Sequence, residues 1–466
     1  MNRTPRPIAS ACVVIALAAG TALADPIPAT RLDFQLPGTQ PGMIPNGTLL
    51  DSANCRACHG NISDNDPYAT WSGSLMGQAA RDPLFYAQMT LANQDVANAG
   101  EFCLRCHVPN AQVSGHVQPP DGTGLTTFDM DGVSCHMCHS MVDPIYNPAT
   151  SPSVDQQIIA ALGPLAPQYY GNAMFVLDPT GLRRGPRAPA ALHDAVRSDF
   201  FTSSNMCGTC HEVGNVATIK QPDGTYRYNP MNQAPDDLNP AHQFPLERTF
   251  SEWRLSSFAA GGVDMGGRFG GVGVTVVSSC QSCHMPRVAD RSCIVGPNRP
   301  DMARHDFAGA SAQVLDIIAA YTANDPAVSQ LNIAKGRAKA VDMLKRAASL
   351  SATQAGETLT ARVTNESGHK LPTGHIEGRR VWLNVRFTSA LGDLVGEYGA
   401  YHGLTADLDA DTTTVFEMHV GLDGYAAAVT GFPAGPTGRM SLANTIVKDN
   451  RIPPRGFNNA AFEAAG

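Results

Sequence analysis

The chain has 466 residues, enough for about three domains, and its 44 glycines and 34 prolines predict many loops. Beyond the first two dozen residues no apolar run approaches the ~18 residues that a membrane-spanning helix needs, so a membrane transporter is excluded. The formal net charge of −8 argues against nucleic acid as a partner.

The first 24 residues have the pattern of a secretory signal peptide. Arg3 and Arg6 precede an apolar stretch over residues 8–19, and an Ala-Leu-Ala cleavage site ends at Ala24. We therefore predict that residues 1–24 are removed and that the mature protein is exported, to the periplasm or to the outside of the cell. Cleavage would leave 31 basic and 41 acidic side chains.

Eleven cysteines would remain after cleavage, and ten of them form five copies of Cys-x-x-Cys-His rather than a disulfide framework. Two thiols at this spacing can form thioethers to one haem, and the adjacent histidine can reach its iron. Zinc sites would not need a histidine after every second cysteine, and five thioredoxin-like pairs in one chain are implausible. Motifs 1 to 5, in chain order, are Cys55/Cys58/His59, Cys103/Cys106/His107, Cys135/Cys138/His139, Cys207/Cys210/His211 and Cys280/Cys283/His284.

The motifs predict five covalently attached haem c groups and a multihaem cytochrome fold over residues 25–312. We expect a mostly irregular chain with short α-helices around the haems, which would supply the core that aliphatic side chains otherwise provide. Residues 83–93 have a short helical pattern. Trp71-x-x-Ser and Trp253-x-x-Ser indicate either a weak internal repeat or two ordinary amphipathic helix starts.

The last third of the chain predicts regular structure. Residues 313–350 have helical periodicity with a break at 324–326, where Asn-Asp-Pro occurs. Residues 357–364, 381–388 and 413–420 alternate with the two-residue period of strands. We therefore expect a β-sandwich-like domain over 351–466, incomplete in this sequence because no closing strand follows.

Five irons with protein ligands on both faces need five further ligands, and nine histidines lie outside the motifs. His193, in an expected short helix before motif 4, and His305, after motif 5, lie in haem-rich sequence and are candidate distal ligands. His136 lies inside motif 3, so it could ligate only a neighbouring haem. A solvated or structural histidine is the alternative for each of them.

Two further candidates lie elsewhere in the chain. His369, in Gly-His-Lys-Leu-Pro-Thr-Gly, would dock the β-region onto the haems, and His375 competes for this role. Met76 offers a thioether that would raise the potential of its haem, with core packing as the alternative. The remaining histidines, interpreted as surface or structural residues, are His116, His242, His402 and His419.

Two weaker signals favour ordinary structure. Residues 407–411, Asp-Leu-Asp-Ala-Asp, resemble the first half of a calcium loop, but Thr412 replaces its glycine and Met418 its closing glutamate. An acidic turn is the favoured interpretation over a calcium site. Cys293 has no motif partner, and a buried free thiol is favoured over iron ligation.

With five such motifs after a signal peptide, the chain resembles the multihaem c-type cytochromes. Residues 50–310 are similar to the group related to the tetrahaem electron-accepting partner of hydroxylamine oxidoreductase. Relatives carry Trp-x-x-Ser-x-His, whose histidine is a distal ligand. In this chain Met76 takes the place of that histidine in one copy and Phe258 in the other. Residues 368–382 resemble the C-terminal β-region of larger multihaem cytochromes. Pentahaem nitrite reductases match less well, because they use lysine in one motif where this chain has histidine.

These features together predict an exported carrier that passes electrons between redox partner proteins, other cytochromes among them. One alternative is an oxidoreductase in which one open haem acts on a small nitrogen or sulfur compound. Another is a subunit of an extracellular electron-conducting assembly.

Overall fold

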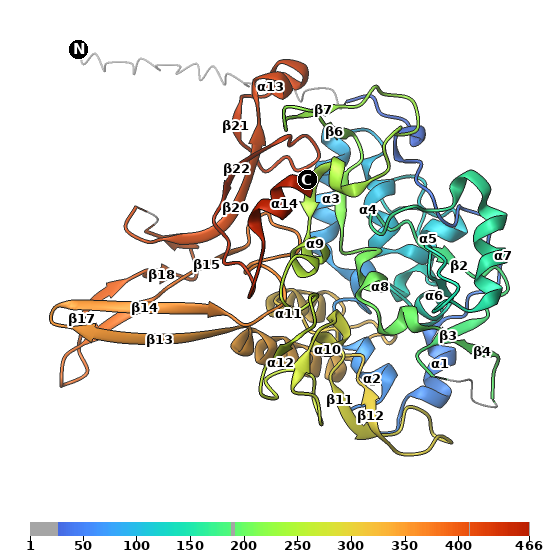
Figure 1. Cartoon of the computed structure of the whole chain (residues 1–466), viewed down its shortest axis with the longest axis horizontal. Coiled ribbons are helices and arrows are strands. Elements are labelled where there is room, and N and C mark those ends of the chain that lie inside the picture. The colour runs from blue at the N-terminus through green and yellow to red at the C-terminus, as the bar shows by residue number, and fades with distance from the viewer. Residues whose placement is uncertain (1–26, 188–191, 410, 466) are drawn as a thin grey trace, which may run out of the picture.

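The computed structural model describes residues 27–187, 192–409 and 411–465 (Figure 1). The predicted signal peptide, residues 1–24, lies outside the described residues. Among the residues that are described, no helix is both long and apolar enough to cross a membrane.

Short helices joined by loops make up the first part of the chain, as the sequence predicts. The expected helix over 83–93 is present with a slightly later end. The helices are α1 (Ser52–His59), α2 (Pro67–Ser72), α3 (Pro83–Asp95), α4 (Ala99–His107), α5 (Pro109–Ser114), α6 (Cys135–His139), α7 (Ser153–Leu162), α8 (Ser204–Gly208), α9 (Thr249–Arg254) and α10 (Cys280–His284). Between them lie the 3-10 turns η1 (Arg31–Phe34), η2 (Ala79–Arg81), η3 (Asp129–Asp131), η4 (Gly163–Leu165), η5 (Asp199–Thr202) and η6 (Pro240–His242).

Short strands connect these helices in two-stranded pairs. The pairs are β1 (Met141–Val142) with β2 (Val176–Leu177), β3 (Arg183–Gly185) with β4 (Ala195–Arg197), β5 (Val213–Asn215) with β8 (Phe244–Glu247), β6 (Thr218–Lys220) with β7 (Tyr226–Tyr228), β9 (Val263–Asp264) with β10 (Val276–Val277), and β11 (Arg287–Asp290) with β12 (Arg299–Ala303). Of the six pairs just named, β3 with β4 is parallel and the other five are antiparallel. The buried apolar side chains form separate small clusters.

The predicted helical segment is two helices, α11 (Ala312–Tyr321) and α12 (Gln330–Ala347). The break falls around Pro326 as expected, because proline cannot continue a helix. Helix α12 approaches α2 very closely at two glycines. A Cβ on Gly336 would lie 1.8 Å from the carbonyl oxygen of Gly73, so only glycine permits this contact.

The C-terminal region is rich in strands, as predicted, but it differs from a sandwich. The hairpin of β13 (Ala348–Ala355) and β14 (Thr358–Asn365) and that of β16 (Val385–Thr388) and β17 (Leu394–Tyr398) project from the body on the same side (Figure 1). The register of β13 with β14 places Leu350, Ala361 and Val363 on one face, but most side chains of this hairpin are exposed or half-buried, so no second sheet covers that face as it would in a sandwich.

Nearer the body, β20 (Val415–Leu422) is the centre of a four-stranded sheet with β15 (Arg380–Trp382), β21 (Gly435–Pro436) and β22 (Thr445–Asp449). The strand predicted over 381–388 is therefore divided between β15 and β16. The remaining elements are β18 (Tyr401–His402), β19 (Asp407–Leu408), α13 (Gly424–Thr430) and α14 (Asn459–Ala465).

A buried ion network fixes the strand β3. The Arg184 side chain is fully buried and bonds to Asp155 at 2.6 Å and to Asp178 at 2.8 Å. The backbone carbonyl of Arg184 is in turn the hydrogen-bond partner of His139 in motif 3, at 2.7 Å. The network therefore supports the residue behind a motif histidine.

Replacing Arg184 with methionine should destabilise the protein by about 3–5 kcal/mol, because two buried carboxylates lose their cation. Arg187→Met is the matched control, since Arg187 pairs with Asp301 at the surface and such pairs contribute about 1 kcal/mol or less. Chemical unfolding of both variants measures the difference. Equal losses in the two variants would contradict the role given to the buried network.

Candidate haem-binding sites

Each motif starts on a short helix. Motifs 1, 2, 3 and 5 end with the histidine as the last helical residue of α1, α4, α6 and α10, whereas motif 4 begins in α8 and ends in the following turn. Side-chain caps begin four of these helices: Asp51 for α1, Ser134 for α6, Ser203 for α8 and Ser279 for α10.

The ten cysteine thiols of the motifs are alike in bonding and in exposure. All ten are free and half-buried, so none forms a disulfide, and their bonds to haem stay a prediction. They belong to Cys55, Cys58, Cys103, Cys106, Cys135, Cys138, Cys207, Cys210, Cys280 and Cys283.

In motif 1 the second cysteine is tied to a distant loop through its backbone and not through its thiol. Cys58 lies in the last turn of α1, and its carbonyl accepts the N–H of Ile294 at 2.9 Å. Ser292, two residues before Ile294, supplies the carbonyl that bonds His59. The loop between β11 and β12 therefore holds both Cys58 and His59 and leaves the Cys58 thiol for the predicted thioether.

Three motif histidines face a second histidine at the same distance. The ring centroids are 6.3 Å apart in each pair: His59 with His193, His139 with His305, and His284 with His369. A metal–imidazole bond of about 2 Å, with ring nitrogens roughly 1.15 Å from the centroid as bonds of ~1.35 Å require, puts two imidazoles on one iron about 6.3 Å apart. The donor set and its spacing therefore fit haem iron.

In each of these three motif histidines the ring nitrogen Nδ1 has the same kind of partner, a backbone carbonyl oxygen. Nδ1 lies 2.6 Å from the Ser292 carbonyl oxygen in His59 and 2.7 Å from that of Arg184 in His139. In His284 it lies 2.7 Å from the Ala308 carbonyl oxygen. A carbonyl can only accept, so Nδ1 carries the proton and donates it. Nε2 then keeps the lone pair that binds a metal.

Motifs 2 and 4 differ from the other three. The His107 ring stacks on Phe85, with centroids 4.1 Å apart and planes 10° from parallel. His211 Nδ1 lies 2.8 Å from Oε1 of Glu247, a carboxylate in place of a carbonyl. All 14 histidines lie within the described ranges, and none of them pairs with His107 or His211 at the 6.3 Å spacing.

The pKa values separate His211 from His107, His284 and His305. Burial lowers the pKa of His305 to about 3 and those of His107 and His284 to about 4, because a charged imidazolium is poorly solvated there. Neutral imidazole is the metal-binding form. The His211 side chain is about half exposed; its partial desolvation would also lower its pKa, but the charge and hydrogen bond of Glu247 raise it to about 9.

The structure corrects one sequence prediction and refines another. Both ring nitrogens of His136 are used by the backbone: the N–H of Leu50 donates to Nδ1, and Nε2 lies 2.9 Å from the Gly181 carbonyl oxygen. Neither nitrogen is free for iron, so we withdraw His136 from the ligand set. His193 lies in an exposed loop and not in the expected helix.

The other candidates lie apart from the pairs. Met76 is half-buried, and its role as an iron ligand stays a prediction. His375 is close enough for its charge to lower the pKa of His107, after the larger effects of burial and Glu247. The four histidines interpreted as surface or structural residues have side-chain partners: His116 with Asp129, His242 with Asp237, His402 with Thr405 and His419 with Glu417.

Neither weaker motif acquires a ligand role from its neighbours. Asp409 accepts hydrogen bonds from the backbone N–H groups of Asp411 and Thr412 and from the hydroxyl of Thr412, which is the geometry of an acidic turn. Cys293 is a half-buried free thiol.

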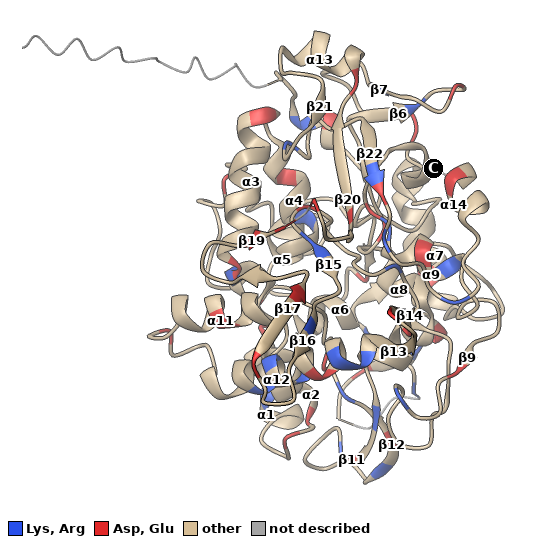
Figure 2. Cartoon of the chain, turned by 90° about the vertical axis from the view of Figure 1, so that its left-hand side faces the viewer, with Lys and Arg blue, Asp and Glu red and all other residues tan. Residues whose placement is uncertain are grey.

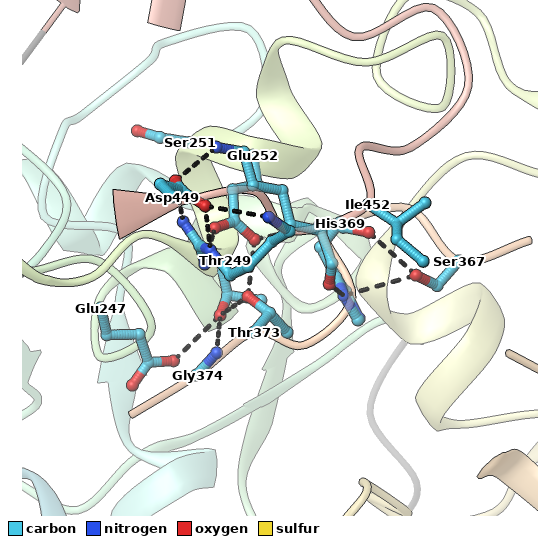
Figure 3. Close-up of polar contacts among 12 residues, drawn as sticks. Glu247, Thr249, Ser251, Glu252, Ser367, His369, Thr373, Gly374, Asp449 and Ile452 are labelled. Atoms are coloured by element: carbon cyan, nitrogen blue, oxygen red, sulfur yellow. Dashed lines mark hydrogen bonds and ion pairs between the residues drawn. The ribbon is translucent and has the colours of Figure 1, made fainter. Parts of the chain in front are cut away.

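A buried carboxylate ties the His369 loop to α9 (Figure 3). Glu252 accepts the backbone N–H of Lys370 at 3.1 Å and the hydroxyl of Thr373 at 2.6 Å, and its other oxygen bonds Arg451 at 2.7 Å. Lys370 and Arg451 both bind Asp449. This network holds the loop in place, and with it the ring of His369 opposite His284.

Separate motifs lie close together in the structure. Cys55 and Cys135, the first thiols of motifs 1 and 3, are close enough to shift each other's pKa, as are Cys207 and Cys280 of motifs 4 and 5. In each pair a serine three residues before the first motif joins the helices. Ser52 Oγ accepts the N–H of Cys135, and Ser204 Oγ accepts the N–H of Cys280, both at 3.1 Å. Cys106 and Cys210, the second thiols of motifs 2 and 4, pack against one apolar cluster.

The two tryptophan segments are equivalent in the structure. Trp71 Nε1 donates to the Val133 carbonyl at 2.9 Å, and Trp253 Nε1 donates to the Ser278 carbonyl at 2.8 Å. Each carbonyl stands two residues before the first cysteine of motif 3 or motif 5. Together with the serine contacts, this supports an internal repeat in which motifs 1 and 3 correspond to motifs 4 and 5.

Residues 54–140 match the family model described as "Cytochrome c554 and c-prime". The matched segment contains motifs 1 to 3. The match supports a c-type cytochrome, with covalently bound haem c and a role in redox electron transfer. No curated protein and no solved structure matches the chain.

Sequence reasoning missed the residues that orient the histidines. Glu247 and Glu252 carry no motif, and only the fold brings Glu247 to His211 and Glu252 to the His369 loop. The carbonyl partners of His59, His139 and His284 are backbone atoms, which leave no mark in the sequence.

Replacing Glu252 with glutamine should weaken the attachment of the His369 loop by about 1.5–3 kcal/mol, because charge-assisted hydrogen bonds are lost beside a buried arginine. Faster hydrogen exchange in residues 367–374 measures the effect. Glu377→Gln, at an exposed position of the same region, should leave exchange unchanged. Unchanged exchange in Glu252→Gln would show that Glu252 does not hold the loop.

Proposed function

We propose that this chain is an exported pentahaem cytochrome that passes electrons between redox partner proteins, such as other cytochromes, in the periplasm or outside the cell. The observation that supports it best is the set of three histidine pairs at one spacing, each including a motif histidine. Haem bound at each motif would supply reversible one-electron chemistry.

In this proposal His193, His305 and His369 are the distal ligands for motifs 1, 3 and 5. Each pair would give its iron two protein ligands, which would keep external molecules from these three irons. Sites of this kind carry electrons without binding a substrate. The backbone carbonyls behind the motif histidines hold the rings in one orientation.

The motif contacts support a route that differs from chain order. Serine hydrogen bonds join the helices of motifs 1 and 3 and those of motifs 4 and 5, and Cys106 and Cys210 of motifs 2 and 4 pack against one apolar cluster. Motif 3 lies beside motif 4 in one apolar cluster, which includes Met137 and the neighbouring Cys210. We propose the order 1, 3, 4, 5, with motif 2 attached at motif 4.

In this proposal the surface of this chain that meets redox partners carries charges of both signs. Figure 2 shows lysine, arginine, aspartate and glutamate spread over the helical and strand-rich parts. Such interspersed charge favours short-range docking over long-range attraction to a partner of one sign.

A second candidate function rests on motifs 2 and 4. His107 and His211 have no histidine at the 6.3 Å spacing, and the charges of Glu247 and Arg379 act on the nearby His375. An iron at either motif would keep a position for a small nitrogen or sulfur compound. In that case the chain would be an oxidoreductase that uses the other three sites to move electrons.

The number of attached haems tests the proposal. The intact mass of the mature protein should exceed that of the polypeptide by five haems. Replacing both Cys280 and Cys283 with alanine should remove one haem, while Cys293→Ala should remove none. A mass that corresponds to fewer than five haems in the wild-type protein would contradict the pentahaem assignment.

Removing a distal ligand should open one iron. His305→Ala and His369→Ala should each convert one of five haems from low spin to high spin, and the reduced protein should bind one more carbon monoxide than wild type. His402→Ala is the control, because His402 is exposed and bonds only within its own turn. Unchanged spin states in His305→Ala would remove that residue from the ligand set.

A further inference from the structure

Motif 4 differs from its structural counterpart in what lies behind the iron-binding histidine. Motifs 1 and 4 hold corresponding places in the repeat, because Ser52 and Ser204 make the same contact to the next motif of their half. In motif 1 the ring nitrogen Nδ1 of His59 is bonded to a neutral carbonyl, whereas in motif 4 that of His211 is bonded to Glu247.

Glu247 is held for this contact from more than one side. It is the last residue of β8, which pairs with β5 close after motif 4. The hydroxyl of Thr249 donates to the same oxygen, Oε1, that faces His211, at 3.2 Å, and contacts Thr373 of the His369 loop at 2.9 Å. The positive charge of Arg379 also acts on the carboxylate.

A carboxylate behind a ligating histidine has a known physical effect. It attracts the Nδ1 proton more strongly than a carbonyl does, so the ring becomes a more basic ligand. A more basic ligand stabilises the higher charge of ferric iron and lowers the reduction potential. Hydrogen bonding around the ligand is one of the means by which a protein sets that potential.

We propose that Glu247 is a positioning residue that holds the reduction potential of the motif-4 haem below the value that a carbonyl partner would give. The inference rests on the proposed function, since it requires a haem at motif 4. Because motif 4 contacts motifs 2 and 5, Glu247 sets a step in potential at the junction of the route. Electrons that cross between the two halves of the repeat must pass this step.

Glu247→Gln tests the proposal, because glutamine keeps an oxygen that accepts from His211 and removes only the charge. In a spectroscopic redox titration of the five-haem protein, the midpoint potential of one of the five transitions should rise by at least 59 mV, because for one electron this is a tenfold change in the reduction equilibrium. Glu247→Asp retains the charge on a shorter side chain and so places it farther from His211. This variant should give a smaller rise of the same transition.

Two controls separate charge from structure. Thr249→Val removes a hydrogen bond to Glu247 but leaves the carboxylate, and Glu377→Gln removes an exposed carboxylate elsewhere. Glu377→Gln should leave all five transitions in place, whereas Thr249→Val, which keeps the charge, should move the motif-4 transition less than Glu247→Gln does. An equal rise in potential in Thr249→Val would overturn this inference and leave the proposed function standing. Five unmoved transitions in Glu247→Gln with five haems attached would do the same. A wild-type protein without haem on Cys207 and Cys210 would overturn the proposed function as well.

Discussion

Three imidazole pairs, each with ring centroids 6.3 Å apart, join parts of this chain that are far apart in sequence. His59 meets a loop at residue 193, His139 meets His305, and His284 meets a loop of the C-terminal region. The buried apolar side chains form several separate clusters, so in the proposed function the rest of the architecture depends on what these pairs hold. In the proposed function each pair holds one iron, and five haems supply the common core.

The groups behind the histidines explain how such pairs stay aligned. Backbone carbonyls fix the rings of motifs 1, 3 and 5, and the buried Arg184 network supports one of those carbonyls. On the distal side, Glu252 ties the His369 loop to α9 and to Arg451. The C-terminal region reaches motif 5 through this loop, and it also packs on the first part of the chain through the ion pairs Arg439–Asp95 and Arg227–Asp423 and through shared apolar clusters. Motif 4, with Glu247 behind His211, is the departure from this pattern.

The sequence was sufficient for local features and insufficient for the long-range ones. The cysteine motifs, the helix after Pro83, the break near Pro326 and the strand over 357–364 depend on spacing within one element. The pairing of His59 with His193 depends on the tertiary fold, and no local pattern encodes it. The expected sandwich failed because alternation in residues 357–364 does not reveal whether either face is covered. His136 was misjudged for a similar reason, since the backbone groups that bond its ring come from residues 50 and 181.

Anomalous diffraction at the iron absorption edge tests the central claim most directly, because it locates each iron independently of the protein chain. The account predicts five iron peaks in crystals of the mature protein, three of them midway between His59 and His193, His139 and His305, and His284 and His369. Iron that is absent from these midpoints, or two rings of one pair bound to different irons, would contradict it.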